Sequence, residues 1–502
     1  MESIPKRSGW FSHSRLLSRG ALLGLLLILA TGGCDGDAGG NGGTSGTSGT
    51  SGTSGTSGTG GTAGTGGTAV AGVWHEATLI EQDDAGDAKD PRLAGSRGGN
   101  AVVAWLQWDG DRNNVWANTY DRGTGWQTAA PIEHKNGDAA DPQVAISPSG
   151  TNAMAVWSQL DDSMISNVRV NRHGTLWRAE ATTVNLDNGW LAYAPQVVVY
   201  EGGSAKVVWT ERFRVQFRIW ANSFQPSVDP LQLKWWGAER IATDTDTADI
   251  PALVGYEGGG AMAAWRESDS LGHPNVWASR YDTVLDWGTA VPIGNADALL
   301  AEDIRLVADA GRNVMAVWHQ VDGGGADNSV RANRYVPGSG WGDAEPLEAD
   351  TGVPPKPEVA MDPAGNAVVV WAHWDDSTSS QNIMAKRYED GRGWQAAEAI
   401  DEGTGDASNP HVAVDPAGNA MAVWKQRDDT IPNTHDIWSR HYDAATGQWA
   451  EPELVETGDG PASVPRVSLD ADGNALAVWQ QWDDTLSHND IWANRWAPRD
   501  VD

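Results

Sequence analysis

Carboxylates lie beside tryptophans at a fixed place in a repeated part of this sequence. An aspartate follows four residues after a repeated tryptophan in most copies of the repeat: Asp109, Asp161, Asp269, Asp322, Asp375, Asp428 and Asp483, with Phe213 in the remaining copy. A second tryptophan directly precedes three of these aspartates, at Trp108, Trp374 and Trp482. An indole can stack on a pyranose ring while a carboxylate accepts its hydroxyl hydrogen bonds. These pairs predict contact with carbohydrate; the alternative is that they cap strand ends and shield the core.

A second candidate site comes from a position that differs between copies of the repeat. The residue after the proline that opens each copy (Ile304 replaces the proline once) is Arg92, Gln143, Gln196, Ala252, Arg305, Glu358, His411 and Arg466. If the copies surround a common axis, these mostly polar side chains would meet near it. Arginines, a carboxylate and an imidazole there could bind an anionic or sugar ligand, and the alternative is a solvated lining.

Nothing in the sequence identifies an enzyme. The chain lacks a nucleophile elbow, a His-Glu-x-x-His motif, a cysteine cluster and a phosphate-binding glycine loop, so we predict no catalytic residue. The enzyme alternative is glycan cleavage by a pair among Glu358, Asp375 and Asp428, which requires a carboxylate with a raised pKa in a central pocket. We expect no cofactor; Ca²⁺ is the alternative, because 109–113 and 470–474 carry part of a calcium-loop pattern.

The elements that position these residues belong to a repeat of eight copies, clearest as Asp-Pro-Ala-Gly-Asn-Ala-Met-Ala-Val-Trp-Lys-Gln at 415–426. The repeated tryptophans are Trp105, Trp157, Trp209, Trp265, Trp318, Trp371, Trp424 and Trp479. They are separated by 52, 52, 56, 53, 53, 53 and 55 residues. A constant period of this length indicates one supersecondary unit per copy.

Each copy contains four short strands separated by turn residues. In the seventh copy we expect them at 410–415, 420–426, 436–442 and 449–456. The second strand is apolar on both faces, as in a strand that is covered on both sides. We therefore predict an all-β fold, an eight-bladed β-propeller of four-stranded blades over residues 73–502, with the repeated tryptophans filling the layers between blades.

The ends of the repeat region predict how the ring closes. The eighth copy ends after its third strand, at 489–496, while the segment VWHEATLIE at 73–81 matches the fourth strand of other copies, such as WGDAEPLE at 341–348. The N-terminal strand should therefore complete the last blade and remove the exposed edges of an open array. Since the repeated aspartates open loops of one kind, we also expect one strongly acidic face.

The N-terminal segment predicts export and lipidation. Four basic residues (Lys6, Arg7, Arg15 and Arg19) precede the apolar run 21–30, which is too short to span a bilayer, so residues 1–33 read as a signal peptide. Cys34 is the only cysteine, and with Thr31, Gly32 and Gly33 it resembles the lipobox of bacterial lipoproteins. The resemblance implies an acylated Cys34. Residues 34–72, rich in Gly, Ser and Thr, then form a flexible tether.

The net charge of the chain favours some classes of binding partner over others. The chain has 35 basic and 67 acidic residues, a net charge of −32, which disfavours nucleic acid. We expect a monomer attached to the membrane through its lipid, in the outer membrane or at the cell surface rather than in the inner membrane. Carbohydrate or another protein is the expected ligand.

The lipobox and the repeats together resemble the secreted bacterial β-propeller lipoproteins. The resemblance implies a surface-displayed ligand-binding or interaction module, with a glycan-cleaving hydrolase or lyase, or an envelope assembly scaffold, as alternatives. Sialidases carry their Asp-box turn between the third and fourth strands, whereas the Asp-x-x-Gly-Asn turn here lies between the first and second. Quinoprotein dehydrogenases have a Thr-Gly pair before their repeated tryptophan, which is missing here, so no quinone is expected.

Overall fold

The computed structural model describes residues 72–81, 86–186, 188–226, 234–243, 245, 247–269, 271–295, 298–322, 328–349, 351–402, 405–427, 434–456, 458 and 460–498. The predicted signal peptide, Cys34, the tether up to residue 71 and Asp428 lie outside this part of the chain. In the described residues, no helix is long and apolar enough to cross a membrane.

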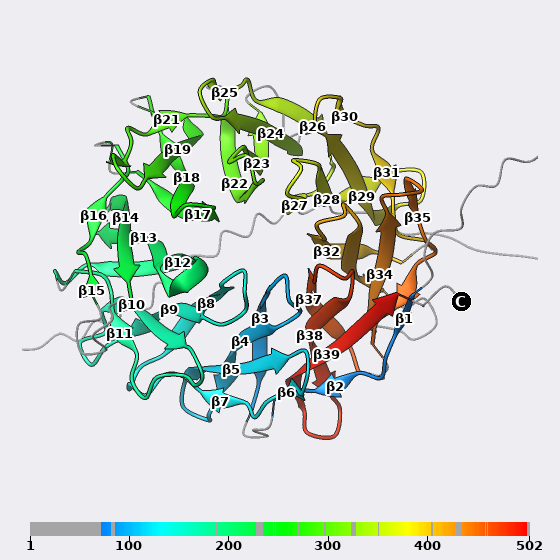
Figure 1. Ribbon diagram of the computed structural model, residues 1–502, viewed down its shortest axis with the longest axis horizontal. Helices are drawn as coiled ribbons and strands as arrows, with labels where there is room; N and C mark the ends of the chain where they lie inside the picture. Colours follow the sequence, from blue (N-terminus) through cyan, green and yellow to red (C-terminus); the bar gives the residue numbers. More distant parts are fainter. Residues whose placement is uncertain are drawn as a thin grey trace, which may run out of the picture. The chain divides into compact units, whose positions relative to one another are not determined.

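Eight antiparallel sheets form a ring, which confirms the eight-bladed β-propeller (Figure 1). Each blade consists of strands A to D from the centre outwards, and blade 1 begins at β3. The innermost A strands are β3 (Ala88–Gly95), β8 (Ala139–Ile146), β12 (Leu191–Val199), β17 (Asp249–Tyr256), β22 (Ala298–Ala308), β27 (Glu358–Met361), β32 (Ala407–Val414) and β37 (Ala462–Leu469). The B strands are β4 (Ala101–Trp108), β9 (Ala153–Leu160), β13 (Ala205–Phe213), β18 (Gly260–Ser268), β23 (Val314–Asp322), β28 (Ala367–Asp375), β33 (Ala420–Arg427) and β38 (Ala475–Asp483).

The outer half of each blade is less regular. The C strands are β5 (Asn113–Asp121), β10 (Ser166–His173), β14 (Gln216–Gln225), β19 (Pro274–Asp282), β24 (Asn328–Val336), β29 (Ser380–Glu389), β34 (His435–Asp443) and β39 (His488–Pro498). Strand D consists of short pieces: β6 (Gly125–Trp126), β7 (Ala130–Pro131), β11 (Thr182–Thr183), β15 (Lys234–Trp235), β16 (Glu239–Arg240), β20 (Asp286–Trp287), β21 (Val291–Pro292), β25 (Gly340–Trp341), β26 (Glu345–Glu348), β30 (Gly393–Trp394), β31 (Glu398–Ala399), β35 (Gln448–Trp449) and β36 (Glu453–Leu454). One 3₁₀ turn, η1 (Glu201–Gly203), joins β12 to β13.

The fourth strand therefore differs from its expected form. The segment 449–456 was expected to be one strand, but β35 pairs with the C-terminal end of β34 and β36 pairs separately with its middle. Four D segments contain a proline, at Pro131, Pro292, Pro346 and Pro452, and a proline cannot donate a ladder hydrogen bond. The D segments of blades 3 and 6 are interrupted in the same way without a proline, so proline accounts for only part of this irregularity. Strand D is an interrupted outer edge rather than a continuous strand.

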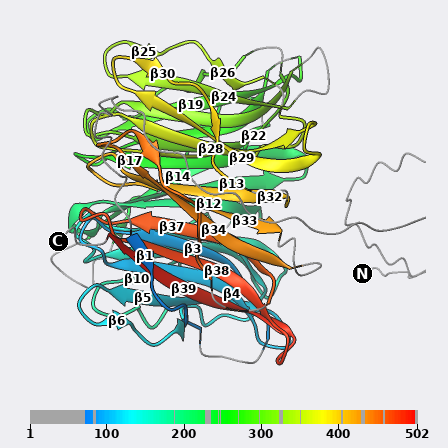
Figure 2. The same ribbon diagram turned by 90° about the vertical axis from the view of Figure 1, so that its right-hand side faces the viewer.

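The predicted closure of the ring is confirmed. β1 (Gly72–Trp74) and β2 (Thr78–Leu79) both pair antiparallel with β39, and they complete blade 8 (Figures 1 and 2). Ile80 is fully buried, and its carbonyl accepts a 3.0 Å hydrogen bond from Asn118 Nδ2 of blade 1. The N-terminal and C-terminal ends of the repeat region are thus paired in one sheet, and the N-terminal end is also hydrogen-bonded to blade 1.

The repeated tryptophans lie in the layers between blades, as predicted. All eight are 0% exposed. Trp209 of blade 3, for example, packs with Met154 and Val156 of blade 2, and Trp105 of blade 1 packs with Val478 of blade 8. The indole N–H usually donates to a Gln or Glu two residues later, as in the 2.9 Å bond from Trp424 to Gln426. Each blade therefore seals one face of its neighbour.

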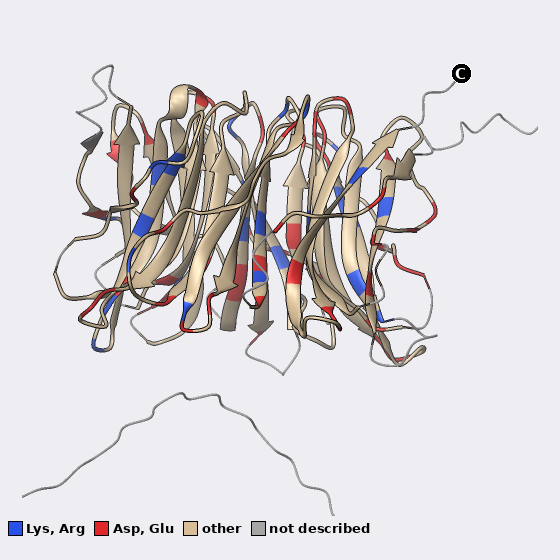
Figure 3. Cartoon of the chain, turned by 90° about the horizontal axis from the view of Figure 1, so that it is seen from below, with Lys and Arg blue, Asp and Glu red and all other residues tan. Residues whose placement is uncertain are grey.

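Carboxylates lie on both faces of the ring, so the expectation of a single acidic face is too simple. Figure 3 shows acidic segments in loops at both ends of the strands, with basic segments on the strands between them. The reason is local: Asp415 in an A–B turn binds the amides of Ala417 and Asn419, just as aspartates at the other face lock their own loops.

Candidate functional site

A backbone irregularity recurs at the start of every A strand, on the channel side of the ring. In each blade, the residue two positions before the varied position has a positive φ of 45° to 55°. These residues are Asp90, Asp141, Ala194, Ile250, Asp303, Lys356, Asn409 and Val464. The A–B pairing shifts register there in most blades, as between Lys89 and Arg92. Asp and Asn tolerate this conformation, but Ile250 and Val464 are β-branched and strained in it. Such a bulge re-aims the side chains that follow it.

The structure brings the charged residues of the varied position together around the channel. The charges of Arg305 in blade 5 and Glu358 in blade 6 affect the pKa of Arg92 in blade 1, although these blades are not its neighbours in the ring: Arg305 lowers it and Glu358 raises it. All five charged or titratable members, Arg92, Arg305, Glu358, His411 and Arg466, are half-buried. We call these five residues the waist cluster. The other members of the position, in blades 2 to 4, are the uncharged residues Gln143, Gln196 and Ala252.

One ion pair fixes part of the waist cluster. Arg305 Nε and Nη2 donate to the two carboxylate oxygens of Glu358, each at 2.9 Å, across the boundary between blades 5 and 6. Burial alone would raise the pKa of Glu358, but Arg305 and then His411 outweigh it and lower that pKa to about 2. Glu358 is thus a carboxylate at neutral pH and lacks the raised pKa that a general acid needs. Asp375 is the last residue of β28, where its carboxylate accepts a hydrogen bond from Ser377, and Asp428 lies outside the described residues.

His411 is held neutral. Its Nδ1 accepts a 3.3 Å hydrogen bond from the backbone N–H of Val467, which places the ring proton on Nε2. Burial lowers the pKa of His411 to about 3, helped by Arg466, Arg305 and Arg92 and opposed by Glu358.

The remaining two arginines lie on neighbouring blades, and neither forms an ion pair with a carboxylate among the described residues, although the charges of Asp90 and Glu358 act on both. Arg92 and Arg466 lie on β3 and β37, which are neighbours in the ring. Among the described residues their guanidinium groups bond only their own neighbouring carbonyls, Pro91 and Pro465. Burial and then the charge of Arg92 lower the pKa of Arg466 to about 10. Burial also lowers the pKa of Arg92, against the opposing effect of Asp90. This geometry leaves two positive groups available to one anion.

The tryptophans predicted to stack on sugars lie separately, each on its own blade at the end of strand B. Trp108 is 37% exposed, while Trp374 and Trp482 are half-buried. The indole N–H groups of Trp374 and Trp482 donate to Asp376 and Asp484, each at 3.0 Å. The structure therefore offers single exposed ring edges on blades 1, 6 and 8 and no joint aromatic platform formed by the three.

The aspartates beside these tryptophans are already engaged in their own loops. Asp109 accepts from Asn114 and from the amides of Asp111 and Arg112, and these bonds lower the pKa of Asp109 to about 2. Asp375 accepts from Ser377, and Asp483 from the amides of Thr485 and Leu486. These bonds fit the structural alternative, in which the repeated aspartate locks the B–C loop.

Carboxylates in the two partial calcium patterns also contact groups of the protein. Asp470 binds Asn474, and Asp472 forms a 2.6 Å ion pair with Arg122. No three His, Cys, Asp or Glu side chains are grouped as a metal site within the described ranges.

Sequence reasoning missed one charged residue that lies in the core. Lys206 occupies a position in strand B that is apolar in the other seven copies, and it is only 5% exposed. An alignment of the eight repeats, compared position by position, would have identified Lys206, just as it identified the varied position of strand A. Inter-blade bonds such as Asn118 to Ile80 could not be found this way, because their partners belong to different copies.

Known proteins resemble this chain only distantly. No protein-family model and no curated protein matches the sequence. Among solved structures, an ulvan lyase of polysaccharide lyase family PL25 is 11% identical over 72% of this chain and 90% of its own, with a TM-score of 0.43. The propeller domain of the Trilobed protease from Pyrococcus furiosus is 10% identical over 74% of this chain and 96% of its own, with a TM-score of 0.42. A protein of unknown function from Dyadobacter fermentans is 13% identical over 63% of this chain and 97% of its own, with a TM-score of 0.39.

Proposed function

We propose that the protein is a binding module whose central channel takes an acidic saccharide, one that carries carboxylate or sulfate groups. The observation that carries the proposal is the pair Arg92 and Arg466, which lacks a carboxylate partner among the described residues although the chain has a net charge of −32. Two half-buried like charges cost free energy, and an anion placed between them would offset that cost.

The rest of the waist suits a ligand that also carries hydroxyl groups. Gln143 and Gln196 supply amide donors and acceptors, and neutral His411 supplies an N–H donor at Nε2. The fixed Arg305–Glu358 pair adds carboxylate oxygens that can accept hydroxyl protons. Binding, rather than cleavage, is supported because Glu358 is ionised and its carboxylate is already paired with Arg305.

Replacing both free arginines should abolish anion-dependent binding. We expect the full chain to bind oligouronates or sulfated oligosaccharides in calorimetry, and Arg92→Gln with Arg466→Gln to weaken binding at least about 30-fold, given the strength of charge-assisted hydrogen bonds. Inorganic sulfate should compete. The control is Arg392→Ala, which removes a positive charge from a side chain that is 80% exposed. Equal affinity for neutral and acidic glycans, or an equal loss in the control, would reject the proposal.

We also propose that the module is exported and displayed on the cell envelope through an acylated Cys34, as a monomer. The proposal rests on the lipobox-like sequence and the Gly/Ser/Thr-rich segment that follows it. The protein should partition into detergent and carry lipid on Cys34 by mass spectrometry, and Cys34→Ala should leave it in the aqueous phase. Detergent partitioning of the Cys34→Ala protein would contradict the anchor.

The titration of His411 predicts how stability depends on pH. Its pKa is about 3 in the folded chain against 6.5 for the free side chain, so the unfolded chain binds a proton between these values that the folded chain does not. Stability must therefore fall as pH decreases through this window. From pH 7 to pH 5 His411 should account for at most about 2 kcal/mol of the loss. Glu358 adds nothing there, since its stabilisation is lost only as pH falls below 4.5 towards 2.

Denaturant unfolding at pH 7 and pH 5 checks this. His411→Gln should lose less stability between the two pH values than the unmodified protein does. His134→Gln, at an exposed position, is the control and should behave like the unmodified protein.

A further inference from the structure

Blades 3 and 4 depart from the repeat at the A–B turn end of the channel. The position of Lys206 is occupied in the other blades by Val102, Met154, Met262, Met315, Val368, Met421 and Leu476. The residue that opens the A–B turn is Ser or Asp in six blades but Tyr200 and Tyr256 in these two. The apolar residue of the other blades would pack at position 206 as well, so we look for the reason for a lysine in its local contacts.

The contacts of Lys206 cross the boundary between the two blades. Its Nζ donates a 2.9 Å hydrogen bond to Ser223 Oγ of blade 3 and lies 3.0 Å from the ring centroid of Tyr281 in blade 4. Burial lowers the pKa of Lys206 to about 8, and the carboxylates of Asp286 and Glu239 act in the opposite direction. Those two carboxylates come from the outer edges of blades 4 and 3.

The two tyrosines fit because their neighbours are glycines. A Cβ on Gly255 would lie 3.0 Å from the Tyr200 ring, and a Cβ on Gly260 would lie 2.2 Å from the Tyr256 ring. The Tyr200 hydroxyl donates to the Gly260 carbonyl at 2.8 Å. Each large ring thus packs against a glycine, and this pairing of large and small residues gives the surface at this blade boundary a defined shape.

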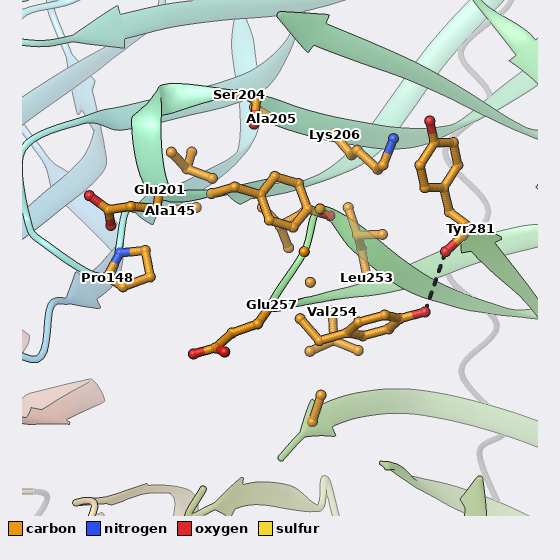
Figure 4. A pocket seen from close by; sticks show the side chains of 18 of the residues that line it. Ala145, Pro148, Glu201, Ser204, Ala205, Lys206, Leu253, Val254, Glu257 and Tyr281 are labelled. Carbon is orange, nitrogen blue, oxygen red and sulfur yellow. Dashed lines mark hydrogen bonds between the residues drawn. The ribbon is translucent and has the colours of Figure 1, made fainter. Parts of the chain in front are cut away.

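These residues line part of a cavity of 1340 Å³ at the A–B turn end of the central channel. All eight blades contribute to its lining, and most of the lining residues belong to blades 3 and 4. Figure 4 shows Lys206 beside Tyr281 on one wall, with Glu201 and Glu257 farther along the opening. Trp236, which is 68% exposed, is one of the lining residues. The volume exceeds the ~300–1,000 Å³ of ordinary small-molecule sites. The waist cluster does not line this cavity.

The groups on the lining select the chemistry of a ligand. Glu239, Glu257 and Asp286 have no hydrogen-bond or ion-pair partner among the described residues, so an anion would be repelled from the rim. A cation would meet the Lys206 ammonium in the wall. A neutral polyhydroxyl compound suits both, because its hydroxyls can donate to the carboxylates and accept from the ammonium. The exposed indole of Trp236 offers a stacking face for the apolar side of a pyranose.

We infer that the blade 3 and blade 4 side of this cavity is a binding groove for a neutral oligosaccharide, held by Lys206, Trp236 and the rim carboxylates. It is a second site, separate from the waist cluster and independent of the function proposed for it.

The full chain should bind neutral oligosaccharides in calorimetry, with glucan, mannan, xylan and galactan oligomers as the probes. Lys206→Met restores the residue of four other blades, and Trp236→Ala changes an exposed side chain. Each should weaken binding at least tenfold. Leu176→Ala, at a side chain that is 80% exposed in blade 2, is the control and should bind normally.

Two measurements separate the groove from simpler explanations. Lys206→Met should unfold at the same or a higher temperature, because replacing a buried charge with an apolar residue is often stabilising, so its loss of binding cannot be misfolding. The Arg92→Gln, Arg466→Gln variant should retain neutral oligosaccharide binding even if acidic saccharides fail at the waist. Failure of every neutral probe at millimolar concentration, or undiminished binding by Lys206→Met, would overturn the inference.

Discussion

Deleting residues 72–81 from the full chain should destabilise the whole propeller rather than its last blade alone. The deletion removes β1 and β2, the pairing partners of β39, and exposes the apolar surface that Ile80 covers. It also removes the Trp74 Nε1 bond to Ser439 in blade 7 and the Ile80 carbonyl that binds Asn118 in blade 1. The lost Ile80 packing and hydrogen bonds together predict at least about 5 kcal/mol of lost unfolding free energy.

The measurement is denaturant unfolding followed by circular dichroism, with hydrogen exchange of the amides in β39 and β34. The matched control is deletion of residues 62–71, which removes the same number of residues upstream of β1. We expect the control to unfold like the unmodified protein. A 72–81 deletion with an unchanged midpoint would mean that the ring is not held by this strand.

Truncating a repeated tryptophan should have the second largest effect. Trp424 is 0% exposed and packs with Val370 and Ala372 of the preceding blade. Trp424→Ala would leave a cavity in the layer between blades 6 and 7, and we expect a loss of about 3–5 kcal/mol in denaturant unfolding. Trp236→Ala, at an exposed indole, should cost far less.

A finer comparison tests why these residues are tryptophans. Trp424→Phe removes an N–H that donates to Gln426. The buried N–H of Trp371, in contrast, has no hydrogen-bond partner in the described part of the chain, because His373 occupies the position where the other blades have Gln or Glu. Trp371→Phe should therefore be less destabilising than Trp424→Phe by about 1 kcal/mol or more. Equal losses would show that packing alone selects the indole.

The sequence was sufficient for the parts of the site that repeat. The varied position of strand A stood out because seven of its eight residues are polar, although the copies around it are alike, and the structure places that position on the channel side of the ring. The tryptophan and aspartate pairs were also found from the pattern. Their carboxylates, however, are used by the amides of their own loops, as at Asp483, and an isolated motif does not reveal whether its oxygens remain free.

The number of blades, the order of strands and the closure by residues 72–81 were determined by the sequence itself. Turn residues, alternation within strands and a buried tryptophan are local features, and eight copies of the same local features leave one arrangement that buries every apolar face. The tertiary structure alone decided which polar residues meet. Arg305 forms an ion pair with Glu358 of the next blade, and the Lys206 ammonium contacts the Tyr281 ring across a blade boundary. Arg92 and Arg466 lie close enough for the charge of Arg92 to lower the pKa of Arg466. These encounters depend on ring closure and on the loss of water around each group, and neither is encoded in any one repeat.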